Sequence, residues 1–237
     1  MRYSDLVIIA QTEVSSRAEK DYRNKTVIYR RCELWEKGNQ INLWTYWQGF
    51  QLKNIDEKGV DILLVGQDWG NPDRNPEVVG TIKRIQSGDR SAVYPCNASV
   101  TDRNLVELFK IYGCDITKRE PGKRIFFTNY SLGYRKGSET GGMTKGLMRK
   151  DSELFDELVT SIKPRVIICL GKITFEMVSH IVTKGFLEKL RNGEPWEAVY
   201  PSDKTIRVYG VAHCGARGLS NVGGMEIMKK AWEKIVL

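Results

Sequence analysis

The chain has 237 residues, 41% of them hydrophobic, which suits one large globular α/β domain with a sizeable core. Its formal net charge of +8 favours a polyanionic partner, most simply nucleic acid, although lysine-rich solvated faces alone produce the same excess. The five cysteines include no Cys-x-x-Cys pair and there are only two histidines, which argues against a disulfide framework, a zinc ribbon and a histidine-based metal site.

Residues 1–55 predict a helical extension that packs on the rest of a single domain, residues 1–237. One helix is expected to begin near Asp5 and to continue or restart near Ser15. An aromatic cluster follows, which we interpret as core packing against a sheet, with a stacking platform for bases as the alternative. Its members are Trp35, Trp44, Tyr46, Trp47 and Phe50.

Residues 61–70 predict a buried strand that ends in a glycine turn holding one carboxylate, Asp68. Their run of Ile, Leu and Val is typical of the centre of a parallel sheet. In open α/β sheets ligands bind outside the carboxyl ends of the strands, where Asp68 would lie. Taken by itself, this segment favours the commoner use of such an aspartate, which is to close a turn or cap the next helix.

A polar stretch with proline and glycine runs from residue 71 to residue 101. It predicts a long loop over a site, with a short helix near residues 77–85. Amphipathic patterns farther along the chain predict helices at residues 102–112, 151–159, 172–181 and 225–236. Strands alternating with helices indicate a parallel sheet covered on both faces.

Three further apolar runs predict strands that end in polar or glycine residues. They are expected at residues 124–130, 165–172 and 206–213. Together with the first strand they predict a three-layer α/β/α sandwich with a central four-stranded parallel sheet. Parallel strands end at one edge, so Asp68, Asn129 and His213 are expected to converge there. An acid, an amide and an imidazole over a glycine-lined cleft form a plausible catalytic constellation.

Common phosphate-binding motifs are absent from the sequence. There is neither a Gly-x-x-x-x-Gly-Lys-Ser/Thr loop nor a Gly-x-Gly-x-x-Gly turn after the first strand. Gly171 and Lys172 open a helix directly after a strand and are candidates to hold a phosphate. The alternative is a turn of the kind that many strand-to-helix junctions use for packing.

The order of these elements over residues 61–237 resembles the uracil-DNA glycosylase superfamily. The first motif reads Gly66-Gln67-Asp68-Trp69-Gly70, and the second is a strand ending in Phe127-Thr128-Asn129. Residues 162–171 resemble the family's Lys-Pro strand that closes with Leu-Gly, and His213 to Arg217 stand at the place of its last motif. The resemblance implies the family's α/β/α fold and base excision from DNA.

The resemblance also implies individual roles. Asp68 would orient or activate the attacking water and stabilise the cationic sugar. Asn129 would read the flipped base, because an amide both donates and accepts hydrogen bonds. His213 would donate to the base O2 as negative charge develops on the leaving base. Gly66, Gln67 and Gly215 would supply backbone contacts to base and phosphate, and Arg217 occupies the place of the residue that wedges into the duplex.

Several positions depart from the family pattern. Trp69 and Cys214 stand where the family has prolines. Because proline fixes the backbone angle φ, these replacements are expected to alter the geometry of both loops. Gly70 replaces the bulky tyrosine that blocks the methyl group of thymine in the strictly uracil-specific branch, so we expect relaxed base choice, including mismatched thymine and deaminated purines. The aromatic residue that stacks on the base is expected to be Tyr94 or Trp69.

We therefore expect a monofunctional glycosylase that needs no metal and no other cofactor. The iron–sulfur branches of the family use four cysteines, and only Cys32 lies near the N-terminus here, so no cluster is expected. The expected partner is DNA. Because the sequence shows neither a membrane span nor a signal peptide, the protein is expected to be cytoplasmic. It is also expected to be a monomer. The alternatives are a catalytically silent nucleic-acid-binding module on the same fold and a nucleotide or nucleoside hydrolase.

Overall fold

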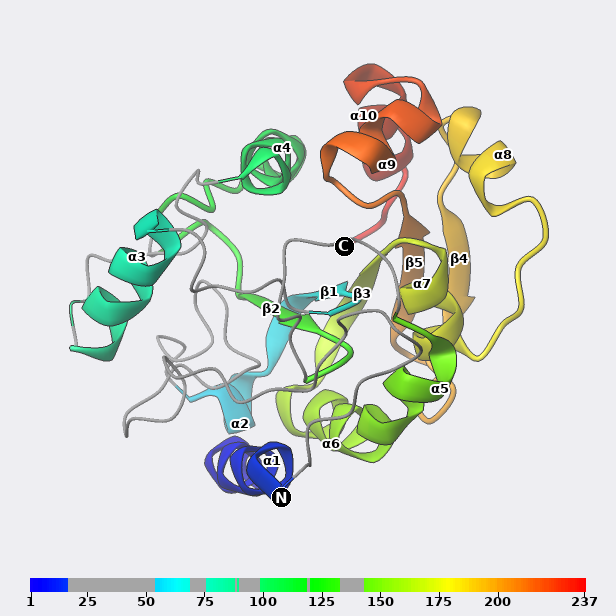
Figure 1. Ribbon diagram of the computed structural model, residues 1–237. Coiled ribbons are helices and arrows are strands. Elements are labelled where there is room, and N and C mark those ends of the chain that lie inside the picture. The colour runs from blue at the N-terminus through cyan, green and yellow to red at the C-terminus, as the bar shows by residue number, and fades with distance from the viewer. Residues whose placement is uncertain (17–53, 69–75, 88, 90–98, 119, 133–142) are drawn as a thin grey trace, which may run out of the picture.

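The computed structural model describes residues 1–16, 54–68, 76–87, 89, 99–118, 120–132 and 143–237. Its centre is one five-stranded sheet, in which the strands lie in the order β2-β1-β3-β5-β4 (Figure 1). The strands are β1 (Val60–Gly66), β2 (Ile125–Asn129), β3 (Pro164–Leu170), β4 (Trp196–Val199) and β5 (Arg207–Val211). Pairing is parallel among β2, β1, β3 and β5, and antiparallel between β4 and β5.

The four strands expected from the sequence form the parallel part of this sheet. The expectation of four strands in all is wrong, because β4 adds an antiparallel edge strand. β4 has only four residues, which alternate between half-buried and exposed. Pro195 and Pro201 lie close to its two ends, so the segment resembles a connection between turns more than a strand.

Helices cover both faces of the sheet. They are α1 (Tyr3–Ser16), α2 (Ile55–Lys58), α3 (Pro76–Gln86), α4 (Val100–Phe109), α5 (Lys145–Met148), α6 (Ser152–Ile162), α7 (Lys172–Ser179), α8 (Phe186–Arg191), α9 (Ala216–Val222) and α10 (Met225–Glu233). Two short 3₁₀ turns, η4 (Lys110–Tyr112) and η5 (Arg149–Asp151), extend α4 and precede α6. The expected helices near 77–85, 102–112, 151–159, 172–181 and 225–236 are confirmed, and α5, α8 and α9 were not anticipated.

One face of the sheet packs against α1, α6 and α7, and the other against α4 and α10 (Figure 1). Tyr3 of α1 meets Phe126 of β2 edge to face, with ring centroids 5.8 Å apart. On the opposite face Phe109 of α4 meets Trp232 of α10 at 5.5 Å. The mixed α/β layers expected from the sequence are therefore present.

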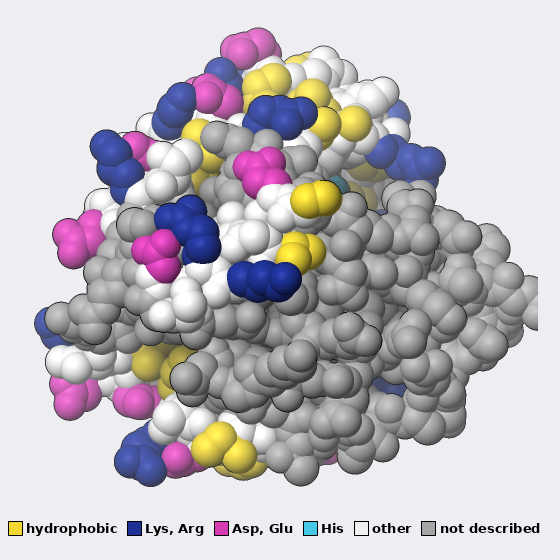
Figure 2. All heavy atoms as spheres, turned by 60° about the vertical axis from the view of Figure 1, so that its left-hand side comes forward, with side chains coloured by type: hydrophobic (Ala, Val, Ile, Leu, Met, Phe, Trp, Pro, Cys, Tyr) yellow, Lys and Arg dark blue, Asp and Glu magenta, His cyan; other side chains and the backbone are white. Residues whose placement is uncertain are grey.

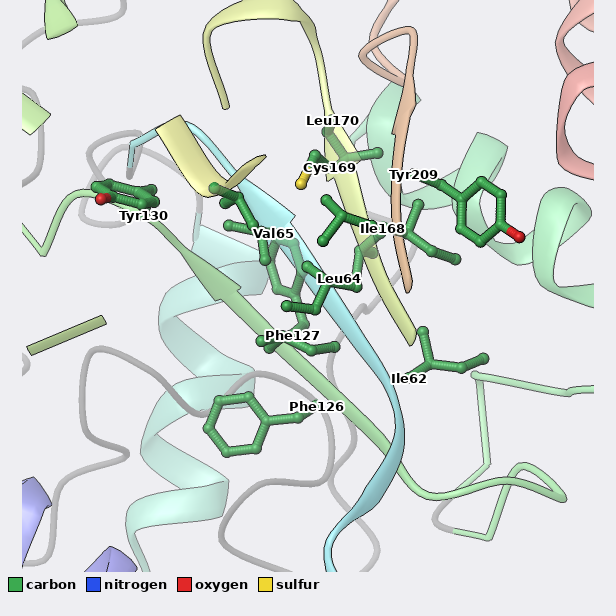
Figure 3. Close-up of a cluster of buried hydrophobic side chains, with 14 of the residues drawn as sticks. Ile62, Leu64, Val65, Phe126, Phe127, Tyr130, Ile168, Cys169, Leu170 and Tyr209 are labelled. Carbon is green, nitrogen blue, oxygen red and sulfur yellow. The ribbon is translucent and has the colours of Figure 1, made fainter. Parts of the chain in front are cut away.

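The central strands β1 and β3 are buried on both faces, which explains their continuous apolar sequences. Leu64 and Ile168 are fully buried and lie side by side in the sheet, as Figure 3 shows. Phe127 of β2 and Tyr209 of β5 continue this apolar layer towards the two sides. A core of this kind fixes the strand register, because a shift by one residue would exchange the two faces.

The first helix, α1, packs on the rest of the described structure. Tyr3, Leu6 and Ala10 of α1 are buried, and the backbone N–H of Tyr3 donates to Asp56 at 2.6 Å. The aromatic cluster from Trp35 to Phe50, together with Trp69, Gly70 and Tyr94, lies outside the described residues.

Packing of α7 on β5 gives a stability prediction. A Cβ on Gly210 would come within 2.6 Å of the Phe175 ring. We expect Gly210→Ala to lower the free energy of unfolding by about 1–3 kcal/mol through overpacking. Gly80→Ala is the control: this glycine lies within α3 with open space around it, so alanine should raise stability by about 0.5–1 kcal/mol. Urea unfolding of both variants measures the change in unfolding free energy. Equal changes for Gly210→Ala and Gly80→Ala would contradict the close contact between Gly210 and Phe175.

Candidate active site at the carboxyl edge of the sheet

Strand register brings the turns that carry the candidate residues to one edge of the sheet. Gly66 at the end of β1 is the partner of Asn129 at the end of β2, and Leu170 of β3 is the partner of Val211 of β5. All four of these strands run in the same direction. Asp68, Asn129, Gly171 and His213 therefore leave the sheet at its carboxyl edge, where ligands bind in open α/β sheets.

The side chain of Asn129 lies directly over Gly66. A Cβ on residue 66 would come within 2.0 Å of the Asn129 Oδ1, so only glycine permits this approach. Asn129 is 6% exposed. Among the residues that the structure describes, none exchanges a hydrogen bond with its carboxamide. An amide that is mostly hidden from solvent and has no partner among the described residues can hydrogen-bond to a ligand with a matching polar edge.

The segment that follows Asn129 is held firmly to the turn after β1. The backbone N–H groups of Tyr130 and Ser131 donate to the carbonyls of Gly66 and Gln67, at 2.9 and 3.0 Å. Farther on, the hydroxyl of Ser131 and the N–H of Leu132 both donate to Asp151, whose side chain is fully buried. This aspartate was not anticipated as part of the site, because an acid before a helix normally signals a cap.

His213 follows β5 and is exposed at the edge. Its Nδ1 accepts a hydrogen bond of 2.9 Å from the backbone N–H of Gly215, two residues farther on. An Nδ1 that accepts carries no proton, so the proton of the neutral ring lies on Nε2. The loop thus selects the tautomer in which His213 presents a donor at Nε2.

The loop after His213 is fixed from two directions. Asn104 of α4 donates through Nδ2 to the carbonyl of Cys214 at 2.7 Å. Gly218 packs so closely that a Cβ there would lie 1.9 Å from the carbonyl oxygen of His213. Cys214 is fully buried, and burial raises the pKa of its thiol. Asn104 was also not anticipated, since its sequence neighbours signal only an amphipathic helix.

The remaining candidates lie at the same edge. Gln67 and Asp68 follow β1 directly and are half-buried, and the carbonyl of Gln67 is already bonded to Ser131. Gly215 precedes α9, and Arg217 is exposed on its first turn. The face shown in Figure 2 carries Lys and Arg mixed with Asp and Glu over its described part, so charge there is dispersed.

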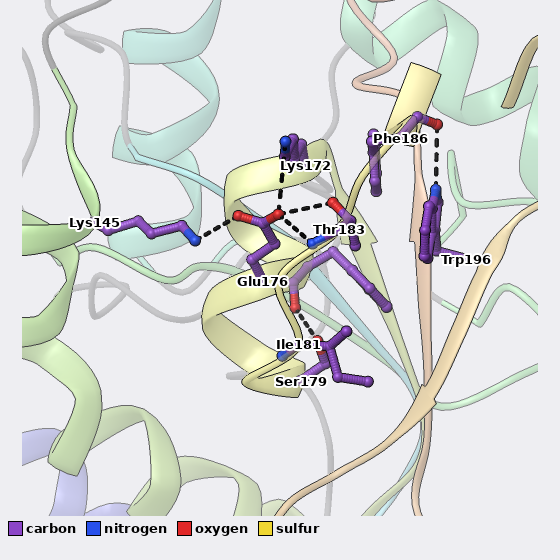
Figure 4. Close-up of polar contacts among 9 residues, drawn as sticks. Lys145, Lys172, Glu176, Ser179, Ile181, Thr183, Phe186 and Trp196 are labelled. Carbon is purple, nitrogen blue, oxygen red and sulfur yellow. Dashed lines mark hydrogen bonds and ion pairs between the residues drawn. The ribbon is translucent and has the colours of Figure 1, made fainter. Parts of the chain in front are cut away.

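The turn after β3 includes Gly171, at a φ of 97° that favours glycine, and Lys172 at the start of α7. Lys172 Nζ lies 3.7 Å from Oε1 of the buried Glu176, which also pairs with Lys145 at 2.5 Å. Figure 4 shows both lysines pointing toward the Glu176 carboxylate. The N–H and hydroxyl of Thr183 each donate to Glu176 at 2.7 Å. Lys172 is thus ion-paired within the protein, and its expected contact with DNA stays a prediction.

Over the described residues, no group of three or more His, Cys, Asp and Glu side chains is placed to hold a metal ion. Within the same part of the chain, no helix is both long and apolar enough to cross a membrane.

Comparison with known proteins adds no assignment. No model of a known protein family matches this chain, and no curated protein sequence matches it.

The contacts of Glu176 with Lys145 and Thr183 make the free energy of unfolding depend on pH. Burial raises the pKa of Glu176, but the hydrogen bonds from Lys145 and Thr183 outweigh this and lower the pKa from 4.5 to about 2. A lowered pKa in the folded state stabilises the protein above pH 4.5, and this contribution is lost as the pH falls towards 2. We expect Glu176→Gln to lower the unfolding free energy at pH 7 by about 3 kcal/mol.

Below pH 4.5 the difference between Glu176→Gln and the wild type should shrink. Denaturant unfolding at a series of pH values measures it. Glu188→Gln, an exposed control in α8, should show little difference at any pH. If the difference in unfolding free energy between Glu176→Gln and the wild type stayed constant with pH, it would contradict the lowered pKa of Glu176.

Proposed function

We propose that this protein is a monofunctional DNA glycosylase that hydrolyses the N-glycosidic bond of uracil, or of another deaminated or mismatched base, flipped out of DNA. The observation that carries the proposal is the side chain of Asn129, a residue only 6% exposed, whose carboxamide has no partner among the described residues at the carboxyl edge of the sheet. The sequence motifs around Asp68 and His213 and the tautomer of His213 support it.

Asn129 would provide base recognition. Its amide nitrogen donates and its oxygen accepts, which matches the O4 and N3–H edge of uracil. A site with an unpaired buried amide discriminates strongly against a base that cannot complete both hydrogen bonds. The close contact with Gly66 and the fixed segment after Asn129 would keep the amide in one orientation before the base arrives.

His213 and Asp68 would act on opposite sides of the bond that breaks. Water forms a new bond to C1′, the bond from C1′ to the base nitrogen breaks, and the electron pair leaves with the base. A neutral His213 with its proton on Nε2 can donate to the base O2 as this charge develops. The carboxylate of Asp68 would orient the water, accept its proton and stabilise the positive charge on the sugar.

Base excision from labelled oligonucleotides tests the proposal. The substrates carry uracil, hypoxanthine, xanthine or a G·T mismatch in single and double strands, and alkali reveals abasic sites. We expect cleavage that falls about 10²–10⁴-fold in Asp68→Asn, because the amide cannot accept the proton of the water. Asp115→Asn, which changes an exposed loop carboxylate, is the matched control and should retain activity. The breadth of substrates cleaved also tests the relaxed base choice inferred from Gly70.

Failure of this test is also informative. Tight, salt-dependent DNA binding without cleavage of any substrate would favour the silent binding module. Hydrolysis of free nucleosides or nucleotides without cleavage of DNA would favour the small-molecule hydrolase. Either result would overturn the glycosylase proposal.

Gly66 and Asn129 should act as a coupled pair in the same assay. Gly66→Ala places a methyl group where Asn129 Oδ1 lies, so we expect excision to fall by about tenfold or more. In an Asn129→Ala background this clash is gone, so adding Gly66→Ala should cost little further. Independent effects of the two changes on kcat/KM would contradict the account of this contact.

A further inference from the structure

A second concave site lies at the opposite end of the sheet. A cavity of about 730 Å³ is bordered by the end of α6, the starts of β3 and β5, and the connection from β4 to β5. Pro164 and Arg207, the first residues of β3 and β5, line it, whereas the candidate active site follows the last residues of these strands. Its volume lies within the range of pockets for small molecules.

Positive charge dominates the side chains that line this cavity. Lys163, Arg165 and Arg207 contribute three cations, and Asp203 is the one acidic side chain in the lining. The Asp203 carboxylate accepts from the N–H and hydroxyl of Thr205, at 2.9 and 2.7 Å. Arg165 lies 3.8 Å from Asp61, while Lys163 and Arg207 have no ion pair among the described residues. The Lys163 ammonium and the Arg207 guanidinium are therefore available to an anion, while the Arg165 guanidinium shares its charge with Asp61.

The walls of the cavity are ordered by contacts within the fold. The N–H of Tyr200 donates to the carbonyl of Ile206 at 2.9 Å, and the N–H of Ile206 donates to the carbonyl of Asp203 at 3.2 Å. These bonds close the connection from β4 to β5 into a fixed turn. Pro164, Val166 and Ile206 are buried beneath the charged groups, and the exposed Val236 of the lining provides an apolar surface for an organic ring.

Lys163 occupies a backbone position where glycine is normally found. It ends α6 in the left-handed region, at a φ of 43° and a ψ of 62°. Helices commonly end on glycine in this conformation because a side chain there is strained. This strained residue lines the cavity together with Arg165 and Arg207.

We propose that this cavity binds a small molecule that carries a multiply charged phosphate group. Guanidinium groups bind phosphate oxygens in pairs, and a lysine adds a further point charge. The apolar surface of the exposed Val236 receives the organic part of the ligand. The site does not depend on the glycosylase activity, because it is formed at the other end of β3 and β5.

Isothermal titration calorimetry with ATP and with inorganic pyrophosphate tests the proposal, and adenosine without phosphate is the ligand control. We expect saturable binding of ATP and no binding of adenosine. The double variant Arg165→Gln/Arg207→Gln should weaken the Kd for ATP by about tenfold or more. Arg149→Gln, an exposed arginine of η5 outside the cavity, should leave the Kd within about twofold.

Methyl NMR of Ile206 and Val166 locates the bound ligand, and thermal unfolding checks that each variant is folded. Shifts of both methyl groups on adding ATP, absent in the double variant, would support the site. Absence of saturable binding by ATP and pyrophosphate, or an equal loss in Arg149→Gln, would overturn it. Tighter binding of oligothymidylate that is displaced by ATP and lost in the double variant would show a nucleic-acid contact instead.

Discussion

Parallel pairing of four strands is the constraint on which the rest of this structure depends. β1 and β3 are buried on both faces, so helices must cover the sheet on each side and every polar turn is pushed to its edges. The turns after β1, β2, β3 and β5 then share the carboxyl edge, although they lie far apart in the sequence. The same pairing gathers the starts of β3 and β5 at the opposite edge, where the cationic cavity lies.

The proposed chemistry follows from how each group is held at the carboxyl edge. Gly66 admits the Asn129 amide, and the Gly215 N–H sets the tautomer of His213. Groups held in place before a ligand binds are the ones that stabilise developing charge most strongly, which is why the proposed function assigns the chemistry to this edge. The buried Glu176 of α7 has a structural role, since its ion pair with Lys145 of α5 and its hydrogen bonds from Thr183 hold these three segments together.

The sequence predicts those parts of the fold whose pattern is long and uniform. β1 and β3 are apolar throughout, and Asn129 and His213 are visible as polar residues that end apolar runs. β4 and the short helices α8 and α9 are not predictable in this way, because four to seven residues carry too little periodicity. Asp151 and Asn104 were missed for another reason: their partners, Leu132 and Cys214, come from elsewhere in the chain, and only tertiary structure brings them together.

The most direct measurement of the central claim is a crystal structure with duplex DNA that carries a 2′-fluorinated deoxyuridine. The fluorine destabilises the cationic sugar and slows cleavage, so the intact substrate can be seen. The account predicts a nucleotide flipped out of the duplex, its base edge hydrogen-bonded to the Asn129 carboxamide and its C1′ facing Asp68. A nucleotide that stays stacked, or a base bound away from Asn129, would contradict it.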